Sequence, residues 1–328
     1  MAEVLNNYKR QILVGAATVG VYVLLEVLRI TGALGDYWMR ITMLSMIMTI
    51  SALGLSLIYG FAGQFSLGHA AFYGIGAYTA GFMTKMMGGS IPMFVIALIT
   101  GALVAGFVGF LIGLPILRLR SDYLGISTLG FGIIVKVLID NTDKLHPAFG
   151  GARGMGGIPD MTNLAWVFWA AVGAILLTRN LVNSSHGRAC ISVREDEIAA
   201  DLMGIDTTRF KTLAFVVGCS LAGLAGGLYA HFDLYLHPSS FDFLKSLDVL
   251  LIVVLGGLGS LTGTVVTAVG MIFALEGLRD LMEWRGVIWA LILIVLMIVR
   301  PQGLMGGKEF SIMPKKTTAK GGSQRASA

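Results

Sequence analysis

Long apolar runs recur along the chain and are separated by shorter polar segments. The clearest of these runs occupy residues 12–28, 43–59, 93–112, 164–177, 213–228 and 287–299. An α-helix needs roughly 20 mostly apolar residues to cross a bilayer, whereas a transmembrane barrel would show short alternating segments. The pattern therefore predicts an all-α fold, a polytopic transmembrane helical bundle in which each helix satisfies its own backbone hydrogen bonds.

The lengths of the apolar runs predict eight to ten membrane spans. Candidate spans fall at about residues 11–30, 38–60, 66–84, 91–113, 122–140, 163–180, 211–230, 245–262, 264–281 and 286–300. Almost no loop separates the eighth candidate from the ninth, and glycines fill that place. We therefore expect a broken or re-entrant element there.

The spans define one transmembrane domain, residues 1–300, which contains a polar loop at 181–211. Residues 301–328 form a basic tail rich in Lys, Gly, Ser and Ala, which we expect to be disordered. With the N-terminus inside, most of the 24 Lys and Arg residues lie on the cytoplasmic side, as the positive-inside rule requires. Both termini and the polar loop are then cytoplasmic.

Composition supports the membrane assignment. Only 13% of the residues are charged, against about 25% in a soluble domain, and the mean hydropathy is +0.79. The net charge of +5 is explained by the Lys and Arg residues of the cytoplasmic segments. We therefore infer no nucleic-acid partner. The two cysteines form neither a disulfide framework nor a metal site.

Two apolar segments are interrupted by glycines and polar residues, at 63–68 (GQFSLG) and 256–263 (GGLGSLTG). Irregular backbone at membrane depth is tolerated only inside protein or beside a water-filled cavity, and paired interruptions point to a transporter's pathway. Their likeness also suggests an internal repeat. The candidate pathway residues are Gln64, Ser66, His69, Gly256, Gly257 and Ser260.

Two of these features have simpler explanations. His69 can serve as a hydrogen-bond partner between helices instead of touching substrate. Small residues four positions apart, such as Gly76 and Ala80, allow close packing of helices, which explains the glycines between residues 70 and 81.

The polar loop contains the sequence SVREDEIAADLMG, which predicts a short helix from Ser192 to Gly204. Ser192 and Glu195 form a capping-box pattern, and glycine suits the C-terminal cap. Ile198 and Leu202 begin an apolar stripe. This helix either packs on its own bundle as an interfacial helix or docks onto another protein.

The string IAADLMG resembles the cytoplasmic EAA-type loop of ABC importer permeases. Ala199, Ala200 and Gly204 match that pattern, whereas Ile198 stands at the usual glutamate position and Glu197 precedes it. The wider strings REDEIAADLMGIDTTRFKTLAFVVGCSLAGLAGGLYA, GQFSLGHAAFYGIGAYTA and VLGGLGSLTGTVVTA are similar to branched-chain amino acid ABC transporter permeases of the LivM type.

The resemblance implies a permease subunit of an ATP-driven importer in a bacterial inner membrane, which carries branched-chain amino acids and is not an enzyme. It implies four kinds of partner: a second related permease subunit, two ABC ATPase subunits, an extracytoplasmic substrate-binding protein and the lipid bilayer. The chain has no phosphate-binding loop of the G-x-x-x-x-G-K-[ST] type, so we expect no cofactor and expect ATP to bind the partner subunits. The implied ATPase-coupling residues are Glu195, Glu197, Ala199, Ala200, Leu202 and Gly204.

Other readings stay open at this point. Related ABC permeases carry urea or short amides, and the residues do not distinguish these substrates. An ion-coupled secondary transporter would need an intramembrane carboxylate, for which Glu276 is the best candidate, although Arg279 at i+3 can pair with it. Lys136 and Asp140 are likewise placed to pair at i, i+4. No residue cluster indicates an intramembrane enzyme.

Overall fold

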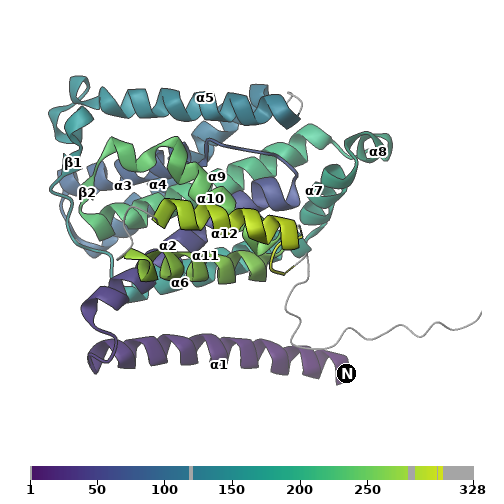
Figure 1. Cartoon of the computed structure of the whole chain (residues 1–328), viewed down its shortest axis with the longest axis horizontal. Helices are drawn as coiled ribbons and strands as arrows, with labels where there is room; N and C mark the ends of the chain where they lie inside the picture. Colours follow the sequence, from purple (N-terminus) through teal and green to yellow (C-terminus); the bar gives the residue numbers. More distant parts are fainter. Residues whose placement is uncertain (1, 118–120, 280–284, 301, 306–328) are drawn as a thin grey trace, which may run out of the picture.

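The computed structural model describes residues 2–117, 121–279, 285–300 and 302–305 of the 328-residue chain. Within these ranges the fold is almost entirely helical, with one pair of very short strands (Figure 1). The tail predicted for residues 301–328 lies outside the described residues, apart from 302–305.

The helices follow the predicted spans in order. The long helices are α1 (Ala2–Ile30), α2 (Asp36–Leu55) continued by the π-helix η1 (Ser56–Phe61), α3 (His69–Met87), α4 (Ile91–Ile116), α5 (Ser121–Asp140), α6 (Leu164–Asn183), α9 (Thr207–Asp233), α10 (Phe243–Gly256), α11 (Leu261–Gly277) and α12 (Arg285–Val299). Between α6 and α9 lie α7 (Ser185–Glu195) and α8 (Glu197–Leu202). Five of the described helices are long and apolar enough to cross a membrane, and α9 is the longest of these five.

Short elements fill the connection between α5 and α6 and the one between α9 and α10. They are the 3₁₀ turns η2 (Thr142–Lys144), η3 (Pro147–Phe149), η4 (Gly151–Arg153) and η5 (Pro238–Phe241), with the strands β1 (Met155–Gly156) and β2 (Tyr235–Leu236). The two strands pair antiparallel, Met155 opposite Leu236. The connection between α5 and α6 is therefore held against the end of α9.

Helix α9 occupies the centre of the bundle and packs against α2, α3 and α4. Small residues bring these backbones close together. A Cβ atom on Gly54 of α2 would lie 2.5 Å from the carbonyl oxygen of Gly218 in α9, and the reverse substitution meets the Gly54 carbonyl at the same distance. Gly76 of α3 similarly faces the backbone of Gly223 in α9, which confirms packing as the reason for that glycine.

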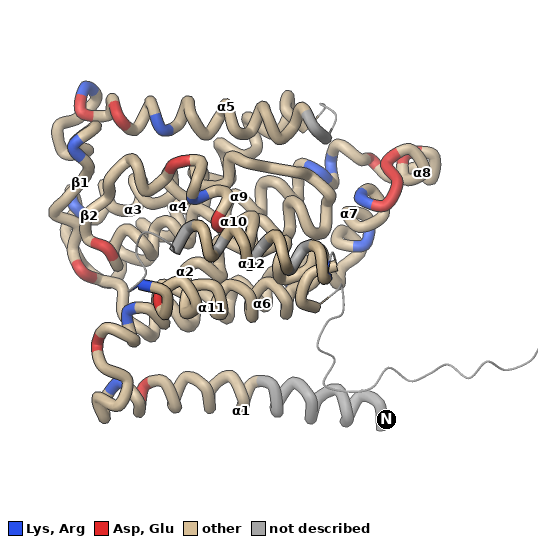
Figure 2. Tube along the Cα trace, viewed as in Figure 1, with Lys and Arg blue, Asp and Glu red and all other residues tan. Residues whose placement is uncertain are grey.

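Most charged residues lie toward the two ends of the bundle, and a few lie on α5 and beside α10 (Figure 2). One end, here called the α7–α8 end, carries α7 and α8, and the start of α1 lies on the same side (Figure 1). The opposite end carries the 141–162 connection and the β1–β2 pair. Helix α5 runs along one flank of the bundle.

The close approach of α2 and α9 generates a stability prediction. Gly218→Ala forces a methyl group against the Gly54 carbonyl, and such overpacking costs about 1–3 kcal/mol. The melting temperature of the detergent-purified chain should fall by several degrees in a fluorescence-detected thermal scan. Gly173→Ala in α6 is the matched control because nothing lies within 4 Å of its Cβ position. Equal melting temperatures for the two variants would contradict this packing.

Candidate functional site

The first interruption begins where α2 turns into η1 and ends where α3 starts. Beyond Phe61 the chain leaves the helix, and α3 begins only at His69. The backbone N–H of Gln64 still donates to the Ile58 carbonyl at 3.0 Å, and that of Leu67 donates to Thr128 Oγ1 of α5, also at 3.0 Å. The break predicted at residues 63–68 is therefore present, and part of its backbone is satisfied by a neighbouring helix.

Three polar side chains of this interruption are buried. Gln64, Ser66 and His69 each retain 1–2% of their exposed surface. His69 Nε2 lies 2.9 Å from the Ser51 carbonyl oxygen, so Nε2 carries the proton and His69 bridges α3 and α2, as its simpler interpretation predicted.

Several polar atoms of these side chains have no hydrogen-bond partner among the residues that the structure describes. They are both amide atoms of Gln64, Ser66 Oγ and His69 Nδ1. A buried polar group without a partner costs about 1–3 kcal/mol. Of the seven such atoms among the described residues, four belong to these three side chains, and each calls for a water, an ion or another polar group as its partner.

The second interruption separates α10 from α11 and is a tight turn. Ser260 caps α11, because its Oγ accepts from the Gly263 N–H at 3.1 Å. Gly256 lies against the backbone of Gly263, and Leu304 N donates to the Leu255 carbonyl at 2.8 Å. Gly256, Gly257 and Ser260 thus have architectural contacts, and their role in a pathway stays a prediction.

The two interruptions lie side by side. A Cβ atom on Gly60 would lie 3.1 Å from the Gly259 nitrogen, and Thr264 Oγ1 of α11 lies 3.4 Å from Ser56 Oγ of η1. Their geometries differ, however, because the first is an extended segment and the second a turn. The internal repeat suggested by their sequences stays a prediction.

Arg194 of α7 connects the polar loop to both interruptions. Its Nη1 donates to the Gly60 carbonyl oxygen at 2.6 Å, satisfying one of the carbonyls that a helix leaves unpaired at its C-terminus. A Cβ atom on Gly63 would lie 2.8 Å from Arg194 Cγ, and one on Gly259 would lie 2.8 Å from Nη1. Both glycines therefore make room for the same arginine. In the sequence Arg194 is one of several charges of the polar loop, and no local pattern marks it as a contact of the interruptions.

The polar loop forms two helices, so the single helix predicted from Ser192 to Gly204 is wrong. Ser184 caps α7 through the Gly187 N–H, and Ser192 lies inside that helix. Asp196 interrupts the helix with extended backbone and caps α8 by accepting from Ile198 N and Ala199 N.

The end of α8 matches the prediction. Gly204 has φ +80°, its N–H donates to the Asp201 carbonyl, and Ile205 N donates to the Ala200 carbonyl at 3.1 Å. This is the Schellman arrangement of hydrogen bonds, which favours glycine at the position after the cap.

The predicted coupling residues occupy distinct positions around α7 and α8. Glu195 pairs with Arg194, and Glu197 pairs with Lys211 of α9 at 2.5 Å. Ala200 faces the protein and is 4% exposed, whereas Ala199 is exposed.

An exposed apolar edge runs along α8. Ile198, Leu202 and Met203 are 75%, 83% and 82% exposed. The loop helix was expected either to pack on its own bundle or to dock onto another protein. The exposure of these side chains favours docking.

Ion pairs also lie near the opposite end. Lys136 of α5 binds Asp242 at 2.7 Å, so its expected pairing with Asp140 is wrong. Glu276 lies 3.6 Å from Arg279, as predicted, and Arg279 also donates to the Tyr37 hydroxyl. In the part of the chain that the structure describes, no group of three or more His, Cys, Asp or Glu residues could hold a metal ion.

These features define a polytopic, all-helical membrane protein whose interrupted helices meet a helical loop. The chain belongs to the family described as the permease component of branched-chain amino acid transport systems, whose model matches residues 37–300.

Individual relatives agree with this membership. The high-affinity branched-chain amino acid permease LivM of Salmonella typhimurium is 34% identical over 315 residues, covering 86% of this chain and 73% of the relative. The corresponding protein of Escherichia coli K12 has the same identity and coverage. LivH of Salmonella typhimurium is 27% identical over 288 residues, or 79% of this chain and 91% of the relative. No solved structure is significantly similar to this chain. The predicted family resemblance is confirmed.

The contacts of Arg194 predict that α7 stabilises both interruptions. Arg194→Ala removes the donor to Gly60, so amide hydrogen exchange at residues 60–68 and 256–260 should rise at least tenfold in the full chain in lipid nanodiscs. Arg188→Ala, on the same helix, removes only a bond to the Asn183 carbonyl and should leave both segments unchanged. Equal exchange in the two variants would show that Arg194 does not hold the interruptions.

Proposed function

We propose that this chain is a membrane-spanning subunit of an ATP-driven importer that carries branched-chain amino acids delivered by an extracytoplasmic binding protein. The observation that carries the proposal is the path of contacts from the exposed edge of α8, through Arg194 of α7, to both interrupted helices. Through these contacts, a partner protein that binds α8 and hydrolyses ATP can move the interrupted helices. The names of the LivM and LivH relatives supply the substrate class.

The partners we propose are those that the family resemblance implies. Two ATPase subunits bind the α7–α8 loops of two related permease chains, with Ile198, Leu202 and Met203 entering an apolar groove. The similarity of this chain to both LivM and LivH supports a heterodimer. The α7–α8 end then faces the cytoplasm of a bacterial cell, both termini lie there, and the binding protein approaches the opposite end.

ATP-driven closure of the ATPases would move α7 and α8 as a rigid unit. Arg194 would transmit this movement to the Gly60 carbonyl and to the turn at Gly259. The unpaired polar atoms of Gln64, Ser66 and His69 would then interact with the passing substrate. Low affinity suits such a route, because selectivity can reside in the binding protein.

Uptake measurements test the energy source. Proteoliposomes containing this chain, its second permease and its ATPases, with binding protein outside, should accumulate radiolabelled leucine only when ATP is enclosed and while ion gradients are collapsed. Excess urea or acetamide should not compete. Gradient-driven uptake by this chain alone would overturn the proposal in favour of an ion-coupled transporter, and competition by urea or acetamide would reassign the substrate.

The docking edge of α8 is tested by a charge substitution. Leu202→Asp places a carboxylate in the proposed apolar interface, so binding of the ATPase subunits should weaken at least tenfold, or about 1.4 kcal/mol, in a titration of the nanodisc-embedded permease pair. Leu145→Asp is the matched control, because Leu145 is 82% exposed at the opposite end. An equal affinity for both variants would exclude α8 from the interface.

A further inference from the structure

The chain returns to the second interruption after α12 ends. Leu304 donates its backbone N–H to the Leu255 carbonyl oxygen at 2.8 Å, and Met305 donates to the Gly256 carbonyl oxygen at 3.3 Å. Both acceptors belong to the last turn of α10. Residues 302–305, here called the C-terminal strap, therefore lie against the turn that joins α10 to α11.

The C-terminal strap completes the cap at the end of α10. A helix leaves its last four carbonyl groups without partners inside the helix. The Gly257 N–H lies 3.2 Å from each of the Val253 and Val254 carbonyl oxygens, and the strap supplies donors for the next two carbonyls. Leu255 is 3% exposed and Gly256 is also buried. The strap therefore takes the place that water takes at an exposed helix end.

Close contact between two glycines allows the strap to reach α10. Gly303 is buried and has φ +77°, and Gly257 has φ +104°. A Cβ atom on Gly303 would lie 2.5 Å from Gly257 Cα and 2.9 Å from the Val254 carbonyl oxygen. A side chain at position 303 would therefore strain the backbone and push the strap away from α10.

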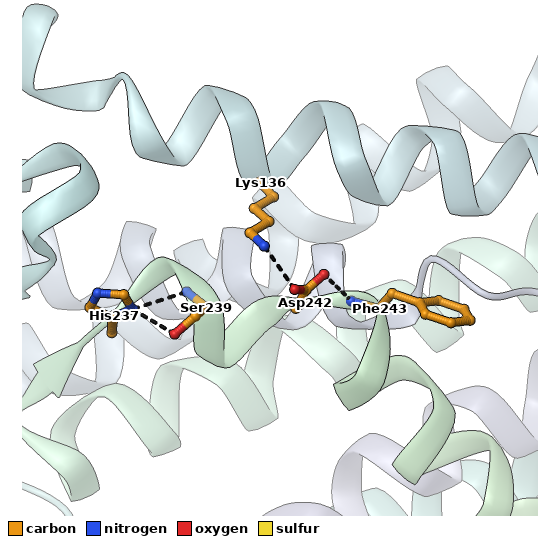
Figure 3. A network of polar contacts seen from close by, with 5 residues as sticks. All are labelled: Lys136, His237, Ser239, Asp242 and Phe243. Carbon is orange, nitrogen blue, oxygen red and sulfur yellow. Dashed lines mark hydrogen bonds and ion pairs between the residues drawn. The ribbon is translucent and has the colours of Figure 1, made fainter.

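The two ends of α10 are held by different elements. At its start, Asp242 accepts from the Phe243 N–H at 2.6 Å and binds Lys136 Nζ of α5 at 2.7 Å (Figure 3). At its end, α12 finishes on the side of the molecule that carries α7 (Figure 1). The second interruption is thus contacted from α7, where Gly259 makes room for Arg194, and from α12, through the strap.

Resting on the proposed function, we infer that the C-terminal strap is a positioning element that holds the end of α10 while Arg194 moves the turn beside it. Movement of α7 then changes the backbone at residues 257–260, because the strap prevents the end of α10 from following α7. Without the strap, α10 and the turn follow α7 together, and ATP hydrolysis proceeds without a change in the pathway. The strap itself touches no substrate in this mechanism.

Hydrogen exchange tests the contact itself in the full chain in lipid nanodiscs, without ATP or partner proteins. Gly303→Ala displaces the strap, so amide exchange at residues 257–260 and 304–305 should rise at least tenfold. Gly88→Ala is the matched control, because Gly88 also has a positive φ, +91°, and nothing lies within 4 Å of its Cβ position. Equal exchange at these residues in the two variants would overturn the inference.

A second variant removes one hydrogen bond and keeps both glycines. Proline has no backbone N–H, so Leu304→Pro removes the donor to the Leu255 carbonyl. Leu304→Ala keeps that N–H and shortens a side chain that is 44% exposed. Exchange at residues 257–260 should rise at least tenfold in the proline variant and stay within twofold of the unsubstituted chain in the alanine variant. The same exchange in both would overturn the inference, even where Gly303→Ala fails to fold.

The ratio of ATP hydrolysis to uptake distinguishes a positioning role from a purely structural one. In proteoliposomes that hold the complete complex, Leu304→Pro should reduce leucine uptake at least tenfold while ATP hydrolysis stays within twofold of the unsubstituted complex. Leu304→Ala should leave both rates unchanged. A parallel loss of uptake and hydrolysis in the proline variant would overturn the positioning role.

The same measurements separate failure of this inference from failure of the proposed function. ATP-driven uptake with an unchanged ratio of hydrolysis to uptake in Leu304→Pro would overturn the role of the strap and leave the importer assignment intact. Exchange that rises as expected, in a complex that shows no ATP-driven uptake, would leave the contact of the strap intact. That result would remove the importer assignment and, with it, the role of the strap in coupling.

Discussion

Every backbone group inside an apolar bundle needs a hydrogen-bond partner, and this requirement governs how the two interrupted helices are built. Arg194 donates to the Gly60 carbonyl, Thr128 accepts from Leu67 N, and Ser246 accepts from Ala70 N. These partners come from α7, α5 and α10. The first interruption is therefore supported from three neighbouring helices, and movement of any of them changes its hydrogen bonding.

Ion pairs also connect neighbouring elements of the bundle. The ion pairs link elements that are otherwise loosely attached: Lys136–Asp242 joins α5 to α10, and Glu197–Lys211 joins α8 to α9. Exposed ion pairs contribute little to stability, about 0–1 kcal/mol. Their value here is positional, because they hold α5 and α8 against the bundle.

The helices were predictable because their signals are local. Run length placed most of the spans within a few residues, although α1 begins at Ala2, nine residues before its predicted start, and α10 ends at Gly256, six residues before its predicted end. Glycine content located both interruptions. The loop helix was misplaced for a reason that local patterns do not contain. Ser192 and Glu195 satisfy a capping pattern, but Gly187, Cys190 and Val193 are buried against the bundle. Because of this burial, α7 starts at Ser185 and continues past Ser192 to Glu195. Asp196 then caps α8, which starts at Glu197.

The sequence by itself determined the helical class, the order of the spans, the positions of the interruptions and the membership of the family, because each depends on composition, spacing or motifs along the chain. Only the tertiary structure decided which residues meet. Arg194 and Gly60 are 134 positions apart, and Lys136 bypasses the nearby Asp140 for Asp242, 106 positions away. Such pairings depend on how whole helices pack, and no local spacing encodes them.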